Sequence, residues 1–292
     1  MPLNFHRPSS LREAMDLKQD LGEACHFLAG GTDLMIQRNR GRKIVGAVVD
    51  LSRLRGLDRI EPLGDGLRIG ALARMRALET DERVRILAPA LAEAARVVGG
   101  AQVRHMATLG GNIANASPAA DTVPVLLALA AFVVVLGPNG ERRVPIAELL
   151  AGRGRTTLQA AEIITHVELP RPARGSAFLK AGRRKAMEIA VVNAAVSLEL
   201  DAKGLIHAAR LALGAVADRS LVVADAEAMM RGQAPSPELF KAAATLARDA
   251  SRPISDVRAS ADYRRHLASV LTERALTLAH KRLVAATTGI PA

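Results

Sequence analysis

The chain has 292 residues, a formal net charge of +11 and a sequence pI near 10.8. Apolar residues make up 49% of it, enough for a sizeable core, but aromatic residues make up only 2%. With no tryptophan and a single tyrosine, Tyr263, the sequence lacks the stacking platforms that bind single-stranded nucleic acid. The basic residues are spread along the chain, which favours the charge being a general feature of an arginine-rich composition. The alternative is an anionic partner, which could be nucleic acid, a membrane surface, a phosphate-bearing cofactor or an acidic protein.

Cysteine content and hydropathy limit which disulfides, metal sites and membrane segments the chain can have. Cys25 is the single cysteine, so the chain forms no internal disulfide and cannot hold an iron–sulfur cluster or a structural zinc by itself. The longest apolar run, Val123–Leu136, contains Pro124 and is shorter than the roughly 20 residues of a membrane span. We therefore expect no transmembrane segment and a cytoplasmic location.

Helices are predicted where a capping residue precedes an apolar pattern of helical spacing. They cover residues 9–21, 34–40, 83–98, 123–130, 221–231, 236–249 and 262–286. Strands are predicted in short β-branched or alternating runs. They cover residues 25–28, 44–51, 57–60, 67–71, 132–136, 162–169, 176–180, 191–200 and 205–213. Because strands and helices stop alternating regularly after residue 55, the chain is predicted to be α+β.

The first of two glycine-bearing stretches is Ala29–Leu34, which lies between a predicted strand and a predicted helix. Adjacent glycines let backbone N–H groups converge on one point, and such a concavity binds phosphate oxygens. The alternative is an ordinary glycine turn in which Thr32 or Asp33 caps the helix. Taken alone, this stretch favours the turn.

The second stretch begins at Thr108–Asn112 and continues through Ser117 and Pro118 to Asp121. Its small polar residues allow N–H and amide donors to approach a pyrophosphate closely. Asp121 either accepts a hydrogen bond from a ribose hydroxyl or caps the helix that follows. Two such stretches, about 80 residues apart, suit a ligand with two phosphates and a long body, such as a dinucleotide. Neither is a Rossmann or P-loop fingerprint.

Together these motifs resemble the FAD-binding medium subunit of molybdenum hydroxylases, the family of the xanthine dehydrogenase and bacterial carbon monoxide dehydrogenase flavoproteins. Later pieces also match, among them Phe178–Arg184 and Tyr263–Leu267, so the resemblance covers essentially the whole chain. It implies a two-subdomain, PCMH-type FAD-binding domain over residues 1–172, followed by a smaller C-terminal α+β domain with an antiparallel sheet and helices over residues 173–292. The subdomains would cover about 1–55 and 56–172, and Pro170–Pro172 marks the boundary between the domains.

The resemblance also implies which residues contact the cofactor. The two glycine stretches would hold the FAD pyrophosphate and ribityl chain, Asp121 the adenosine side, and three further residues the flavin. The full set is Ala29, Gly30, Gly31, Thr32, Asp33, Leu34, Val98, Thr108, Gly110, Gly111, Asn112, Ser117, Asp121, Ile164 and Lys180. No residue is expected to act as a catalytic acid, base or nucleophile, and no metal-ligand spacing is present among the seven histidines.

The function that the resemblance implies is electron transfer within an oxidoreductase complex. A small subunit would carry [2Fe–2S] clusters and a large subunit the molybdenum cofactor, as a dimer of heterotrimers. FAD on this chain would pass the electrons to NAD, a quinone or oxygen. One alternative is a self-contained FAD oxidoreductase that acts directly on a small molecule. Another is a basic nucleic-acid binder, which explains the charge but not the glycine stretches.

A run of basic residues at Arg183, Arg184 and Lys185 is the densest in the sequence. It is either a solvated loop or a surface that faces a partner subunit or an anionic group of FAD. His105, three residues before Thr108, is a weaker candidate for a residue near the flavin, since a lone histidine is more often structural.

Overall fold

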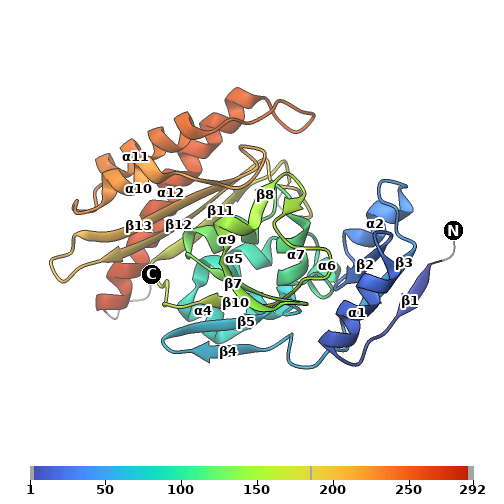
Figure 1. The fold of residues 1–292 in the computed structure, drawn as a ribbon. Coiled ribbons are helices and arrows are strands. Elements are labelled where there is room, and N and C mark those ends of the chain that lie inside the picture. Colours follow the sequence, from blue (N-terminus) through green and yellow to red (C-terminus); the bar gives the residue numbers. More distant parts are fainter. Residues whose placement is uncertain (1–2, 185, 289–292) are drawn as a thin grey trace.

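The computed structural model describes residues 3–184 and 186–288 (Figure 1). Three larger β-sheets follow one another along the chain, and each has helices of its own. The first is a parallel sheet with the strand order β1–β3–β2, and with its two helices it is called the N-terminal unit below. Its elements are β1 (Asn4–His6), α1 (Leu11–Leu21), β2 (Cys25–Leu28), α2 (Leu34–Asn39) and β3 (Ala47–Asp50).

The second sheet has the strand order β4–β5–β10–β6–β7 and forms the middle unit with seven short helices and a small strand pair. β10 lies at its centre, although it is the last of these five strands in the chain. The strands are β4 (Ile60–Leu63), β5 (Gly66–Gly70), β6 (Phe132–Gly137), β7 (Gly140–Pro145), β8 (Leu150–Gly152), β9 (Arg155–Thr156) and β10 (Ile163–Leu169). The helices are α3 (Met75–Thr80), α4 (Glu82–Leu87), α5 (Pro89–Arg96), α6 (Ala101–Arg104), α7 (Leu109–Asn115), α8 (Thr122–Ala128) and α9 (Ile146–Leu149).

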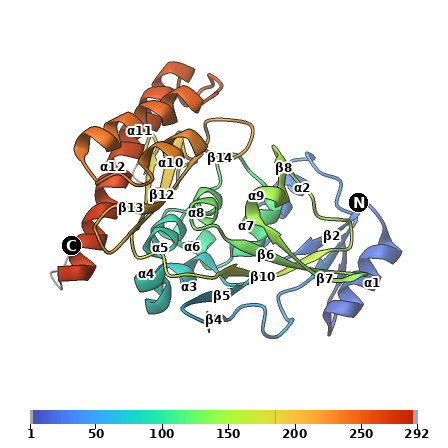
Figure 2. The same cartoon turned by 60° about the vertical axis from the view of Figure 1, so that its left-hand side comes forward.

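The third sheet is antiparallel with the order β11–β12–β13–β14, and it forms the C-terminal unit with three helices. These helices cover one face of the sheet, whereas α5 and α8 of the middle unit pack against the other face (Figure 2). The elements are β11 (Ser176–Ala181), β12 (Val192–Leu200), β13 (Ile206–Gly214), β14 (Leu221–Val222), α10 (Ala224–Met230), α11 (Pro237–Ala250) and α12 (Ala261–Thr288).

Local sequence signals explain where several of these elements begin and end. Ser10 caps α1 by accepting from Glu13 N, while the Glu13 carboxylate accepts from Ser9 N, so two donors at the helix start are satisfied reciprocally. Ser236 caps α11 in the same way by accepting from Leu239 N. Gly204, at φ +77°, makes the tight turn between β12 and β13.

The hydrophobic core is divided among three clusters, which correspond largely to the three units. Alanine, leucine and valine make up most of each cluster, as the low aromatic content requires. The cluster of the N-terminal unit also contains Leu72 and Ile163 of the middle unit, so apolar packing joins the two. Among the described residues, no helix is both long and apolar enough to cross a membrane.

The fold class is confirmed: the chain combines a mixed N-terminal region with an antiparallel C-terminal sheet covered by helices. The single helix predicted over residues 83–98 is wrong, because the chain forms α4 and α5 with a break at Ala88. Pro89 begins the second helix, since its ring fixes φ and it has no N–H to continue the first. The helix predicted from residue 221 begins instead at Ala224, after the short edge strand β14.

Candidate functional site

The two glycine stretches meet at one cavity of about 620 Å³, which lies between the N-terminal unit and the middle unit. Of the fifteen residues predicted to contact a cofactor, twelve line this cavity. They are Ala29, Gly30, Gly31, Thr32, Asp33, Leu34, Val98, Thr108, Gly110, Gly111, Asn112 and Ile164. The other three, Ser117, Asp121 and Lys180, do not line it.

The first stretch is an open loop between β2 and α2. The backbone N–H groups of residues 30–34 donate to no acceptor among the described residues, and Gly31 adopts φ +68°. Asp33 stands at the start of α2 but makes no side-chain cap, because its carboxylate accepts from Gln37 Nε2 instead. Free N–H groups that line a cavity form the concavity that binds phosphate oxygens.

The second stretch forms α7, although the sequence analysis predicted no helix between residues 98 and 123. Thr108 is the N-cap of α7, and its hydroxyl accepts from Gly111 N at 3.2 Å. Leu109 and Gly110 donate their N–H groups to the carbonyls of Ala73 and Ala71, and Asn112 N donates to Thr108 O. The N–H groups of residues 109–112 are therefore already satisfied within the protein.

Close backbone contacts explain two of the glycines without a ligand. A Cβ on Gly30 would lie 2.0 Å from the carbonyl oxygen of Met106, where the N-terminal unit meets the chain that leads to α7. A Cβ on Gly110 would lie 2.7 Å from the Cβ of Ala71 and 2.9 Å from the carbonyl oxygen of Ala71. At Gly111 the nearest atom to a Cβ is the Thr108 hydroxyl, at 2.9 Å. Gly30 and Gly110 thus hold the two units and α7 in close contact.

The cavity is lined by apolar and polar side chains, and each unit contributes both kinds. The apolar lining of the middle unit includes Ile164, Val98, Val103, Leu158 and Leu72. The polar lining of the N-terminal unit includes Lys18, His26, Lys43 and Gln37, none of which the sequence pointed to. These four residues come from α1, β2, α2 and the segment between α2 and β3, so no local motif marks them.

Asp121 and Lys180 form a buried ion pair at the junction of the middle and C-terminal units. Lys180 Nζ lies 2.7 Å from Asp121 Oδ2 and also donates to the carbonyl oxygen of Val97, at the end of α5. Asn193 Nδ2 donates to Asp121 Oδ1 at 3.1 Å. Burial raises the pKa of Asp121, against the opposing effects of Lys180 and Asn193.

These contacts exclude one of the two roles that the sequence left open for Asp121. The residue does not cap α8 with its side chain, because both carboxylate oxygens bond to Lys180 and Asn193. Since Val98 lines the cavity and Lys180 bonds to its neighbour Val97, the pair supports the cavity wall from behind. Ser117 accepts from Ala119 N and shapes the turn before Asp121. Direct contact of Ser117, Asp121 or Lys180 with a cofactor stays a prediction.

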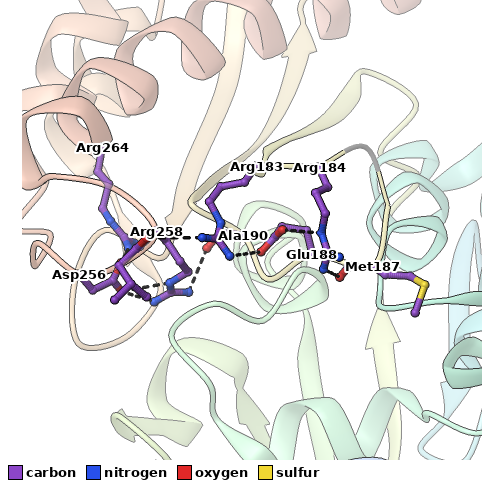
Figure 3. Close-up of polar contacts among 9 residues, drawn as sticks. Arg183, Arg184, Met187, Glu188, Ala190, Asp256, Arg258 and Arg264 are labelled. Carbon is purple, nitrogen blue, oxygen red and sulfur yellow. Dashed lines mark hydrogen bonds and ion pairs between the residues drawn. The ribbon is translucent and has the colours of Figure 1, made fainter.

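The arginine-rich loop between β11 and β12 is tied down at both ends (Figure 3). Arg183 and Arg184 both pair with Glu188, and Arg258 Nη1 donates to Ala190 O. Met187, at φ +55°, lies against Gly100, where a Cβ would come 3.3 Å from Met187 Cγ. Lys185 lies outside the described residues.

The base of this loop rests on one buried arginine. Arg264 is 1% exposed, and its Nη1 donates to the carbonyl oxygens of Val191 and Ala215, while its Nη2 pairs with Asp256 (Figure 3). Arg264 thereby joins α12 to the start of β12 and the end of β13. His105 is exposed, bonds to Ala101 O and does not line the cavity.

Comparison with protein families shows to which family the chain belongs. Residues 1–172 match the FAD binding domain in molybdopterin dehydrogenase, and residues 177–279 match the CO dehydrogenase flavoprotein C-terminal domain. The chain belongs to this family of molybdopterin dehydrogenase flavoproteins. The resemblance seen in the sequence is therefore confirmed.

Individual members of the family align over nearly their whole length. The carbon monoxide dehydrogenase medium chain of Hydrogenophaga pseudoflava is 31% identical over 279 residues, which cover 95% of this chain and 97% of that protein. The xanthine dehydrogenase FAD-binding subunit of Escherichia coli O157:H7 is 32% identical, with 94% of each chain covered.

Solved structures of the family share the fold. A chain of carbon monoxide dehydrogenase from Hydrogenophaga pseudoflava superposes with a TM-score of 0.91 at 32% identity, covering 97% of this chain and 98% of its own. A chain of quinoline 2-oxidoreductase from Pseudomonas putida 86 gives a TM-score of 0.89 at 30% identity, with coverages of 96% and 98%.

Proposed function

We propose that this chain is the FAD-binding subunit of a heteromeric molybdenum hydroxylase and that it holds FAD in the cavity between the N-terminal and middle units. The single observation that carries the proposal is the loop of residues 30–34, which lines a cavity of about 620 Å³ and whose N–H groups donate to no acceptor in the described part of the chain. That volume lies within the roughly 300–1,000 Å³ of small-molecule sites. The residues present fit a cofactor with a diphosphate at its centre.

Each part of the chain has a distinct task in this proposal. The N–H groups of residues 30–34 bind the diphosphate, and Asn112, held by a hydrogen bond from Thr122 Oγ1, adds an oriented amide. Val98, Ile164 and Leu158 supply an apolar wall that excludes water from a flat ring system. Bound FAD supplies the redox chemistry, while the protein sets its position and surroundings.

The proposal places this oxidoreductase subunit after two partner subunits in the path of the electrons. A small subunit with [2Fe–2S] clusters supplies electrons that a large subunit with the molybdenum cofactor takes from the substrate. We further propose a dimer of heterotrimers, a cytoplasmic location, and NAD, a quinone or oxygen as the external acceptor. The domain division into residues 1–172, with subdomains of about 1–55 and 56–172, and residues 173–292 belongs to the same proposal.

The experiment measures flavin retention. The chain is purified alone and also after co-expression with the cluster-bearing and molybdenum-bearing subunits, incubated with FAD and desalted. The expected result is visible flavin absorption at about one FAD per chain, in the chain alone or in the complex. A folded chain that retains no flavin in either form would overturn the proposal.

A further inference from the structure

The loop of residues 182–190, between β11 and β12, carries an exposed methionine in an unusual backbone conformation. Met187 is 64% exposed, and its φ of +55° lies in the left-handed region that residues with a Cβ rarely adopt. The proposed function gives this residue no task. Because a left-handed conformation costs free energy, Met187 keeps it only as long as contacts with its surroundings hold it there.

A hydrogen bond and a packing contact hold Met187 in place. Arg184 Nη2 donates to the carbonyl oxygen of Met187 at 2.8 Å, which ties the residue to its own loop (Figure 3). The side chain of Met187 lies against Gly100 of the middle unit, where a Cβ would come 3.3 Å from Cγ and 3.4 Å from Sδ of Met187. The thioether therefore packs over the backbone of a residue that has no side chain of its own.

This packing contact joins the loop to the middle unit, whereas the polar contacts of the loop stay within the C-terminal unit. Arg183 and Arg184 pair with Glu188, and Arg183 Nη1 lies 3.5 Å from the carbonyl oxygen of Val257. Among the described residues of the loop, no hydrogen bond or ion pair reaches the middle unit. Loss of the thioether contact would therefore free the loop from the middle unit.

The contact lies on a turn between two residues of the cavity lining. Val98 precedes Gly99 and Gly100, Val103 follows them, and both valines line the cavity. Gly99 adopts φ +52°, and a Cβ on it would lie 3.0 Å from Val103 Cβ, so the turn is tightly folded. A change at Gly100 would thus reach the cavity lining, although no described residue of the loop lines the cavity.

The chemistry of a thioether makes this contact sensitive to hydrogen peroxide. The sulfur donates two electrons, the O–O bond of the peroxide breaks, one oxygen atom forms the S–O bond of a sulfoxide, and the other leaves as water. The sulfoxide is polar and chiral, so it disrupts a contact that the flexible apolar side chain made. Oxidation follows exposure, and Met106 is also exposed, whereas Met15, Met75 and Met230 are buried.

We propose that Met187 is a site of oxidation by hydrogen peroxide and that its sulfoxide releases the loop of residues 182–190 from Gly100. In the reduced protein the thioether holds the loop against the turn at Gly99 and Gly100. In the oxidised protein the loop leaves the turn, and the cavity lining at Val98 and Val103 loosens. The site does not depend on which ligand the cavity holds.

The test treats the full chain with millimolar hydrogen peroxide, desalts it and follows two signals. Mass spectrometry of peptides should find sulfoxide at Met187 and Met106 and none at Met75. Limited trypsin digestion should cut after Arg183 or Arg184 about threefold faster in the treated protein, because a released loop is easier to cleave. Both arginines are exposed, so trypsin can reach them.

Three variants assign the effect to one sulfur atom. Met187→Leu keeps an apolar side chain without sulfur, so peroxide should no longer speed the cleavage. Met187→Gln places a polar side chain of similar length there and should be cleaved quickly without peroxide. Met106→Leu is the matched control, since it removes the other exposed thioether and should respond to peroxide as the wild type does.

The remaining outcomes would overturn the inference. It is wrong if Met106 is oxidised while Met187 is not, or if Met187 is oxidised and the cleavage rate stays the same. It is also wrong if peroxide speeds cleavage of Met187→Leu as much as that of the wild type, because the release then starts at another residue.

FAD dissociation gives a second readout for the effect on the cavity lining, and this readout alone rests on the proposed function. We expect FAD to leave the treated wild type about twofold faster than the untreated protein, and the treated Met187→Leu variant at its untreated rate. An untreated protein that binds no FAD would count against the proposed function, while the cleavage assay would still decide the role of Met187.

Discussion

The stretches Ala29–Leu34 and Thr108–Asn112 look alike in sequence and differ in structure. In the first, residues 30–34 line the cavity and their N–H groups donate to no acceptor among residues 3–184 and 186–288. In the second, Thr108 caps a helix and the following N–H groups donate to protein acceptors. A pair of glycines next to a threonine therefore does not by itself make an anion site, because what decides is whether the N–H groups already have partners.

The end of the second stretch also has its polar side chain bonded within the protein. Asp121, at its end, is 6% exposed and bonds to Lys180 and Asn193 across the junction with the C-terminal unit. The first stretch leaves its N–H groups available to a ligand, whereas the second stabilises the fold. The following predictions test this contrast, from the largest expected effect to the smallest.

Asp121→Ala is expected to cost about 3–5 kcal/mol of unfolding free energy, because it leaves the Lys180 ammonium buried without its counter-charge. Urea unfolding measures the loss. The double variant Asp121→Ala, Lys180→Met should recover part of it, since the unpaired charge is gone. A loss of FAD affinity with unchanged stability would instead favour direct contact between Asp121 and the cofactor.

Gly30→Ala is expected to lower stability by about 1–3 kcal/mol, because its Cβ would collide with the carbonyl of Met106 and push the two units apart. Gly46→Ala is the matched control in the same unit, since its Cβ would meet Ala24 at an ordinary 3.6 Å. Thermal unfolding of both variants checks this. Equal melting temperatures would show that the contact at Gly30 adapts without cost.

Gly111→Val is expected to weaken FAD binding at least tenfold while most of the stability is kept. The new side chain would crowd the Thr108 hydroxyl, 2.9 Å from its Cβ, at the cavity lining, and would meet no backbone atom that closely. A flavin titration gives the affinity, and a melting curve of the same sample gives the stability. Wild-type affinity in a folded variant would remove α7 from the site.

Thr108→Ala is expected to destabilise by about 1 kcal/mol through loss of the N-cap of α7. Asp33→Ala should have almost no effect on the stability of the flavin-free chain, because Asp33 does not cap α2. Urea unfolding without FAD compares the two. If Asp33→Ala lowers the free energy of unfolding as much as Thr108→Ala does, Asp33 stabilises the start of α2 as Thr108 stabilises that of α7, and the contrast between the stretches is wrong.

Much of the fold was predictable because its signals are local. Ser10 and Gly22 bound the first helix, and Gly204 marks the turn of the C-terminal hairpin. The α+β class followed from such local patterns, whereas the family was inferred from the resemblance of the two glycine stretches and later motifs to known flavoprotein subunits. The break at Ala88 was missed, although Pro89 provides a signal for it.

The site was predictable only where it is continuous in sequence. The loop of residues 30–34 follows a strand and was found, but the helical state of residues 109–112 depends on the carbonyls of Ala71 and Ala73. Lys18 and Lys43 come together only after the N-terminal unit has folded, and no motif links them. The Asp121–Lys180 pair likewise joins residues 59 positions apart.

Hydrogen–deuterium exchange with and without FAD tests the central contrast most directly. The account predicts that the amides of residues 30–34 exchange quickly without FAD and become protected when it binds. The amides of residues 109–112 should be protected in both states, because they already donate within the protein. Protection that appears at residues 109–112 on FAD binding, with none gained at residues 30–34, would contradict the account.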